Sequence, residues 1–255
     1  MIKTAFIRLL GRPAYKRDAF VSGFEKLGYK VLVDVLPKKI NPEDVLVIWN
    51  RNTPQESLAE KFEQAGAKVV VAENGYIGLD KNGEKLIALA KNHHNGLGEW
   101  NYKNEPARKL EIKPWRKPGD NIVILAQRGI GERGVAQPQG WEFTMLRYFE
   151  KVSKRKIIIK SHPGAVKQNL DPYLENCWAA VTWGSGAAIK ALAYGVPVFY
   201  QLKGWIGGAA ASFSKDIENP FYSEREEMFN KLSWAQWEVD RIASGEALSF
   251  LMVGK

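Results

Sequence analysis

One short stretch of the chain constrains its fold most. It contains an apolar strand, the turn Thr182-Trp183-Gly184-Ser185-Gly186, a helix over Ala187–Tyr194 and a second strand over Val196–Tyr200. Gly195 separates the helix from the second strand. Strands that alternate with helices form a parallel sheet covered on both faces. The stretch therefore predicts an α/β fold.

The first half of the chain repeats this alternation. Its apolar runs predict strands and its helical spacing predicts two helices, which Gly28 and Gly66 end. The strands are expected at 2–10, 30–35, 45–49 and 68–72, and the helices at 17–27 and 55–65. Between Asn92 and Asp120 the pattern stops and prolines and basic residues gather, as in a long loop followed by a linker.

We therefore expect two Rossmann-like domains with parallel sheets that face a cleft. The first spans 1–100, a linker spans 101–120, and the second domain spans 121–222. Residues 224–243 carry an apolar stripe at helical spacing. They predict a C-terminal helix, within 223–255, that packs across the fold.

The amino-acid composition indicates which kinds of ligand the protein can attract. The 37 Lys and Arg residues outnumber the 28 Asp and Glu residues, giving a net charge of +9. Such a surface attracts polyanions, with nucleic acid the obvious candidate and a charged polysaccharide or a membrane surface as alternatives. No apolar run reaches the roughly 20 residues of a membrane span. The single Cys177 favours a reducing, cytoplasmic location, and one Cys with three His argues against structural zinc.

Three polar turns follow predicted strands of the second half. The strand at 122–126 runs into a glycine-rich loop containing Arg128, the strand at 157–159 into His162-Pro163, and the strand at 179–181 into the Ser185 turn. Ligands of open α/β sheets bind at the carboxyl ends of the strands, and free amides at a helix start favour phosphate. The turns predict a nucleotide site.

A simpler explanation of the same residues is that the glycine turn only allows close packing of the helix on the sheet, and that the histidine has a structural role. The phosphate contacts are predicted to come from Arg128, Gly129, Gly131, His162, Gly184, Ser185 and Gly186.

These residues resemble a known family. His162-Pro163, Gly184-Ser185-Gly186 and Gly195-Val196-Pro197-Val198 are similar to the donor-binding domain of GT-B glycosyltransferases, especially the capsule-type and phage-type branches. The resemblance implies that His162 and Ser185 hold the donor's phosphates with help from Arg128. One departure is Lys190, which stands where many such enzymes carry a glutamate that meets the donor's ribose or sugar. A nucleotide sugar, UDP-linked, would be the co-substrate, and the absence of any Asp-x-Asp triplet predicts no metal and no further cofactor.

The first domain must then supply a group that accepts a hydroxyl proton. Glu73 follows the strand at 68–72, and His94 lies in the long loop; either suits general-base catalysis. Each has an equally good structural reading, as a solvated turn residue or a surface loop residue. Contacts to an anionic acceptor are expected from Arg51, Lys113, Trp115, Arg116 and Lys117, because cations hold phosphates and aromatic rings stack on bases.

The sequence thus predicts a glycosyltransferase whose acceptor is a hydroxymethylated pyrimidine in bacteriophage DNA. Three alternatives stay open: a transferase for a capsule or surface glycan, a nucleotide-sugar epimerase, and a DNA-binding protein without catalysis. The oligomeric state is not indicated.

Overall fold

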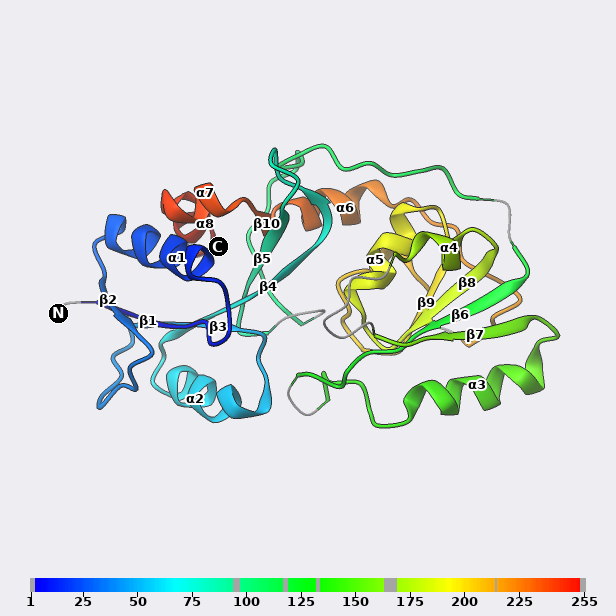
Figure 1. The fold of residues 1–255 in the computed structure, drawn as a ribbon, viewed down its shortest axis with the longest axis horizontal. Helices are drawn as coiled ribbons and strands as arrows, with labels where there is room; N and C mark the ends of the chain where they lie inside the picture. Colours follow the sequence, from blue (N-terminus) through cyan, green and yellow to red (C-terminus); the bar gives the residue numbers. More distant parts are fainter. Residues whose placement is uncertain are drawn as a thin grey trace. The chain divides into compact units, whose positions relative to one another are not determined.

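The computed structural model describes residues 3–93, 97–116, 119–131, 134–162, 169–213 and 215–252. The chain divides into two compact units, the first formed by Met1–Arg108 and Lys231–Lys255 and the second by Lys109–Asn230. Each unit is a sheet with helices on both faces (Figure 1). Both ends of the chain therefore build the first unit.

The first unit contains a six-stranded sheet of order β10-β5-β4-β3-β1-β2. Its strands β2, β1, β3 and β4 are parallel, whereas β5 and β10 pair antiparallel at one side. The strands are β1 (Thr4–Arg8), β2 (Lys30–Val33), β3 (Val45–Trp49), β4 (Lys68–Leu79), β5 (Lys85–Lys91) and β10 (Gln236–Trp237). The helices are α1 (Ala14–Lys26), α2 (Thr53–Gln64), α7 (Val239–Ala243) and α8 (Glu246–Met252).

This unit has two hydrophobic cores, one on each face of its sheet, because successive side chains along a strand point to opposite faces. Ala5 and Val47 pack with α1, α7 and α8 on one face. Phe6 and Leu46 pack with Phe62 of α2 on the other. Figure 1 shows the same layers, with α2 alone beneath this sheet.

The second unit contains a fully parallel sheet of order β7-β6-β8-β9. Its strands are β6 (Asn121–Leu125), β7 (Lys156–Lys160), β8 (Cys177–Thr182) and β9 (Val198–Tyr200). Its helices are α3 (Trp141–Val152), α4 (Asp171–Leu174), α5 (Gly186–Ala193) and a 3-10 turn, η1 (Gly208–Ala210); α6 (Glu226–Ser233) then leads the chain back to the first unit. The α/β class with two Rossmann-like, largely parallel sheets is confirmed.

Two expectations for the first unit were wrong. The strand expected to end at Ala72 continues to Leu79, because the unforeseen β5 pairs with it as an antiparallel hairpin. The single helix expected over Glu224–Ala243 is instead α6, β10 and α7, followed by α8. Gln236 and Trp237 leave the helical path because their backbones pair with β5, and the Gln236 side chain accepts hydrogen bonds from the amides of Tyr76 and Ile77.

No helix in the described ranges is both long and apolar enough to cross a bilayer.

Candidate functional site

The carboxyl edge of the second unit's sheet collects the three polar turns. Leu125, Lys160 and Thr182 are level with one another in the strand register. Arg128, His162 and Ser185 therefore follow neighbouring strands within two or three residues of a common edge. The strand order reverses between β6 and β8, and such a switch point is where open α/β sheets bind ligands.

Ser185 opens α5 at this edge. Its hydroxyl oxygen accepts a hydrogen bond from the Ala187 amide at 3.1 Å, which makes it the N-cap of the helix. Its own amide donates to the Thr182 hydroxyl at 2.8 Å, so the turn is fixed by its own side chains. The first-turn amides give α5 a positive end, which lies at the switch point because the helix begins directly after β8.

Gly184 has a packing role beside this turn. A Cβ atom on it would lie 2.7 Å from a methyl group of Leu202, so the glycine lets the loop after β9 pack closely. The Gly184 amide also donates to the side chain of Gln127 at 3.0 Å. Gly184 thus lies against the loop after β9, whereas Ser185 and Gly186 form the helix start.

The loop after β6 presents an exposed cation. Arg128 is exposed and forms no ion pair with any residue in the described ranges. Gly129 and Gly131 have φ angles of 68° and 138°, conformations that glycine adopts without strain. Gln137 supports the loop, since its side chain accepts from the Gln127 amide and donates to Glu142. Glu132 and Arg133 lie outside the described residues.

His162 stands close to this cation. Partial desolvation, then the charge of Arg128 and that of Lys160, lower the pKa of His162 below its usual value. A bound phosphate would offset these two charges and favour the imidazolium. The geometry therefore suits an anion between the β6, β7 and β8 turns.

In the first unit, Glu73 lies inside β4 rather than in a turn after it. It is one residue beyond Ala72, which pairs with Trp49 at the end of β3, so it still lies at the carboxyl edge of the parallel strands. The carboxylate is largely buried and accepts a hydrogen bond from the Tyr76 hydroxyl. The second candidate base, His94, falls outside the described residues.

Arg51 is already fully engaged within the first unit. Only 2% of the residue is exposed, and its guanidinium donates to Glu56, to Glu63 and to the Asn92 carbonyl. All five of its N–H groups are used. Arg51 thus has no donor left for an acceptor phosphate, and it ties β3 to α2 instead.

The basic part of the linker from Lys113 to Arg116 is packed on the second unit. Lys113 and Arg116 lie over the Tyr194 ring, and Arg116 also donates to the Leu174 and Glu175 carbonyls at the end of α4. Trp115 donates to the Ser223 carbonyl and lies under the Arg225 guanidinium. Trp115 and Arg116 thus hold the linker in place, whereas Lys113 stays exposed and Lys117 falls outside the described residues.

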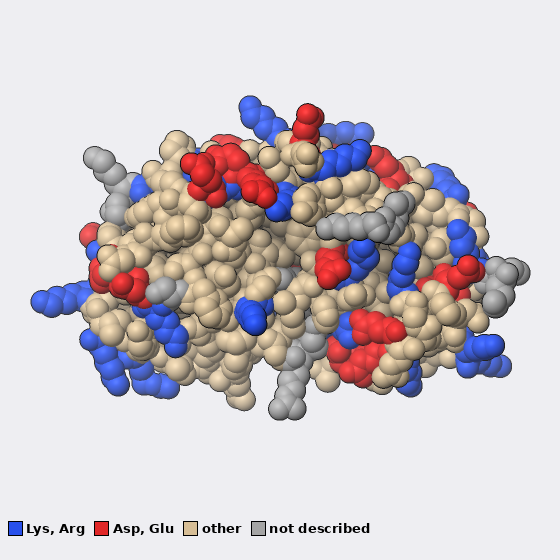
Figure 2. Space-filling model, turned by 180° about the vertical axis from the view of Figure 1, so that it is seen from behind, with Lys and Arg blue, Asp and Glu red and all other residues tan. Residues whose placement is uncertain are grey.

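On the face shown in Figure 2, acidic side chains lie among the Lys and Arg side chains in several places, and several Lys and Arg side chains adjoin at its lower left edge. A continuous stripe of positive charge, the mark of a nucleic-acid surface, does not cross the part of this face that the structure describes.

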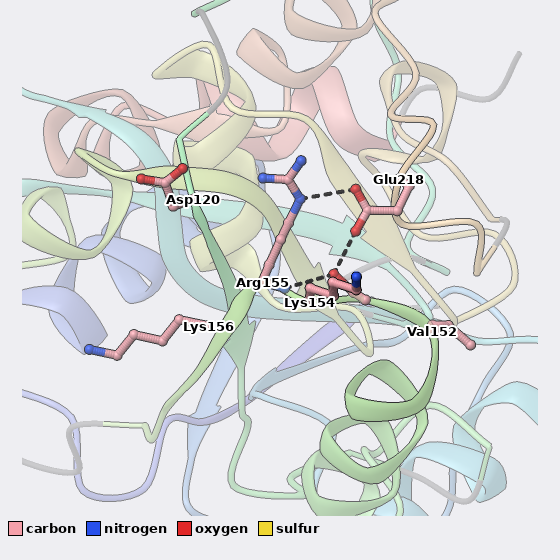
Figure 3. Close-up of a pocket in the computed structure, with 7 residues that line it drawn as sticks. Asp120, Val152, Lys154, Arg155, Lys156 and Glu218 are labelled. Carbon is pink, nitrogen blue, oxygen red and sulfur yellow. Dashed lines mark hydrogen bonds and ion pairs between the residues drawn. The ribbon is translucent and has the colours of Figure 1, made fainter.

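A hollow of about 520 Å³ lies at the opposite, amino end of the second unit's strands (Figure 3). Its central cation, Arg155, donates to Glu218 and to the Gly119 carbonyl and stacks on Trp178. Because this guanidinium is engaged by the protein itself, the hollow is a weaker anion site than the carboxyl edge.

Sequence reasoning missed a second group of cations, in the first unit. Arg12 and Lys16 both lie 5.2 Å from the ring centre of Trp49, which ends β3. Arg12 stands in the loop after β1 and Lys16 in the first turn of α1, beside the point where the strand order reverses between β1 and β3. The sequence pattern that could have predicted this group is Gly11-Arg12-Pro13, a turn with a cation directly after a predicted strand.

The parallel strands of the two units therefore follow the same order, β2-β1-β3-β4 in the first and β7-β6-β8-β9 in the second, and each has a polar switch point, as in two-domain Rossmann-like proteins.

No protein-family model and no curated protein matches the sequence. In fold, the chain is similar to a β-Kdo 2,7 transferase, KpsC of Thermosulfurimonas dismutans, at TM-score 0.54 and 11% identity, over 97% of this chain and 99% of that one. It is also similar to the β-Kdo 2,4 transferase of the same KpsC, at TM-score 0.51 and 13% identity, over 89% of each chain.

Proposed function

We propose that this protein is a glycosyltransferase that moves a sugar from a nucleotide-activated donor to a hydroxyl of a glycan. One observation carries the proposal: Arg128, His162 and the Ser185-capped start of α5 meet at one edge of a parallel sheet, at its switch point. The fold similarity to two sugar transferases supports it.

Each of these groups has a role in the proposed reaction. The bond between the sugar's anomeric carbon and the nucleotide phosphate breaks, and the acceptor oxygen forms a bond to that carbon. The leaving phosphate gains negative charge, which Arg128, the amides at the start of α5 and a protonated His162 would stabilise. The acceptor hydroxyl loses its proton to a carboxylate, for which Glu73 remains our candidate.

A glycan acceptor is favoured over DNA. The two KpsC structures are sugar transferases by name, and nothing in the part of the chain that the structure describes adds support for a DNA acceptor. Of the predicted acceptor contacts, Arg51 has no donor left and Arg116 is held by backbone carbonyls. A capsule or surface glycan thus replaces phage DNA as the proposed acceptor.

Donor binding can be tested by calorimetric titration with UDP, GDP and CMP. Ser185→Asp keeps the helix cap, since Asp caps as well as Ser, but places a negative charge at the phosphate position. Arg128→Gln removes the exposed cation. We expect each variant to weaken nucleotide binding at least about tenfold, since a charge-assisted contact contributes roughly 1.5–3 kcal/mol.

Lys156→Gln is the matched control, because Lys156 is an exposed cation at the amino end of the same sheet. It should bind nucleotide as the unaltered protein does. Equal weakening by Lys156→Gln and Arg128→Gln would refute the site, and so would the absence of binding to any of the three nucleotides.

Transfer is then measured by mass spectrometry, with sugars linked to whichever nucleotide binds and with oligosaccharides or hydroxymethylated DNA as acceptors. Glu73→Gln should slow transfer by about 10²–10⁴-fold while both substrates still bind. Transfer to the DNA alone would restore the nucleic-acid acceptor.

A further inference from the structure

The hairpin of β4 and β5 has a bulge just after Glu73. The pairing of the two strands is regular up to Asn74 and resumes at Leu79. Between these positions, residues 75–78 of β4 stand opposite Leu86 alone on β5. Extra residues in one strand bend it and turn its side chains away from their regular faces. The side chains that follow Glu73 are therefore not bound to the simple alternation of a strand.

This bulge brings Tyr76 back onto Glu73. In a regular strand, residues three apart point to opposite faces, yet here the Tyr76 hydroxyl donates a hydrogen bond to Oε1 of Glu73. Gly75 lets the bulge lie close to β5, since a Cβ atom on it would be 2.9 Å from the Cβ atom and from the carbonyl oxygen of Leu86. Both partners are largely buried, with 8% of Glu73 and 5% of Tyr76 exposed.

Gln236 holds the bulge from the far side of β5. Strands β4, β5 and β10 lie side by side in that order (Figure 1). Glu73 and Gln236 both pair with Ala88, so their side chains point to the same face of the sheet. Oε1 of the fully buried Gln236 accepts hydrogen bonds from the amides of Tyr76 at 2.6 Å and Ile77 at 2.9 Å. The backbone that carries the Tyr76 ring is thus fixed by a strand from the other end of the chain.

Hydrogen bonding influences the charge of a buried carboxyl group. Burial favours the neutral acid, whereas a hydrogen bond donated to the charged form favours the carboxylate. A general base must be ionised before it can accept a proton, and its oxygen must lie within hydrogen-bond reach of the group that loses the proton. The Tyr76 hydroxyl serves both needs, because it stabilises the Glu73 carboxylate and restrains its rotation.

We propose that Tyr76 is a positioning residue for Glu73, which it keeps ionised and oriented to accept the proton of the acceptor hydroxyl. This inference rests on the proposed function, in which Glu73 is the candidate base. As the acceptor oxygen forms its bond to the anomeric carbon, its O–H bond breaks and the proton passes to the Glu73 carboxylate. Tyr76 keeps its own proton and acts only through that carboxylate.

Tyr76→Phe removes the hydroxyl and keeps the ring. In the transfer assay we expect kcat to fall at least about tenfold while the KM values of donor and acceptor change less than about twofold, because the hydroxyl acts on the base and not on either substrate. The loss should shrink as the pH rises, since the carboxyl group without its donor ionises only at higher pH.

Glu73→Gln tests whether Tyr76 acts through the carboxylate. Added to Glu73→Gln, Tyr76→Phe should change the rate by less than about twofold, because the group that it positions is already gone. Tyr29→Phe is the matched control, since it removes a hydroxyl of the same unit that contacts the sulfur of Met252. This control should leave kcat and KM unaltered. Circular dichroism and thermal unfolding would establish that all variants are folded.

The charge of Glu73 can also be followed without any substrate. When the glutamate carboxyl carbons are labelled with carbon-13, the NMR signal that is missing from Glu73→Gln belongs to Glu73. The midpoint of its titration should lie at higher pH in Tyr76→Phe than in the unaltered protein, and Tyr29→Phe should leave it in place.

The outcomes separate this inference from the proposed function. If transfer takes place and Tyr76→Phe leaves its rate unaltered, or slows Glu73→Gln as much as it slows the unaltered protein, Tyr76 does not position the base and the transferase proposal stands. A Glu73 titration that is the same with and without the Tyr76 hydroxyl would also overturn the inference. If no nucleotide binds and no sugar is transferred while Tyr76→Phe moves that titration, the transferase proposal fails, and the control of the Glu73 charge by Tyr76 stands without it.

Discussion

Replacing Arg51 with Met should destabilise the first unit without touching any ligand site. Arg51 donates five hydrogen bonds, to Glu56, to Glu63 and to the carbonyl of Asn92 at 2.8 Å. Methionine fills most of the volume but leaves that carbonyl and two neighbouring carboxylates without their donor.

The magnitude follows from the burial of these groups. Breaking a buried ion pair costs about 3–5 kcal/mol, because a charge is left without compensation. Here the Glu56 and Glu63 side chains retain 24% and 30% exposure, so water can solvate them partly once the cation is gone. We therefore expect a loss at the lower end, about 3 kcal/mol in the free energy of unfolding.

The assay is urea unfolding combined with hydrogen exchange of the α2 and β3 amides, because two units need not unfold together. Arg17→Met is the control: its ion pair with Asp18 is exposed and should contribute less than about 1 kcal/mol. If Arg51→Met were as stable as Arg17→Met but lost affinity for an acceptor, our structural assignment of Arg51 would be refuted.

Four further predictions test other parts of the structure. The buried Cys177 thiol, whose pKa burial raises to about 12, should resist a thiol reagent at pH 8 until the protein unfolds; rapid labelling of the native protein would contradict its burial. Nucleotide affinity should rise as the pH falls through the range in which His162 takes up a proton, because desolvation and the charges of Arg128 and Lys160 lower its pKa in the free protein whereas a bound phosphate favours the imidazolium; His162→Gln should lose its part of that rise, and an unchanged profile would remove His162 from the site. Gly195→Ala should destabilise the second unit by more than about 1–2 kcal/mol, since Gly195 has φ 86° and a Cβ would collide with the Pro114 carbonyl; Gly140→Ala, at φ 71° in open space, gives the strain alone, and equal losses would argue against the collision. Transfer should continue in the presence of a chelator, whereas loss of activity that manganese restores would show a metal requirement.

Much of the architecture follows from local pattern. The strand–turn–helix–strand run through Ser185 is encoded by apolar stretches, a capping serine and Gly195 at the helix end, all within one short segment. Because parallel strands present their carboxyl ends at one edge, the neighbourhood of Arg128, His162 and Ser185 could also be predicted once the strands were placed.

Other features depend on partners far away in the sequence, and no local pattern shows them. Arg51 looked available as an anion contact, but its carbonyl partner Asn92 is 41 residues away, so the chain must fold before its donors are used. The C-terminal stripe predicted one helix, yet Gln236 bonds to the amide of Tyr76, 160 residues away, and its neighbour Trp237 pairs with β5. Sequence by itself determined which segments become strands and helices and which turns end them, because those choices rest on neighbours along the chain. Tertiary structure alone decided which polar side chains are used within the protein, as that of Arg51 is, because burial and partners exist only in the folded state.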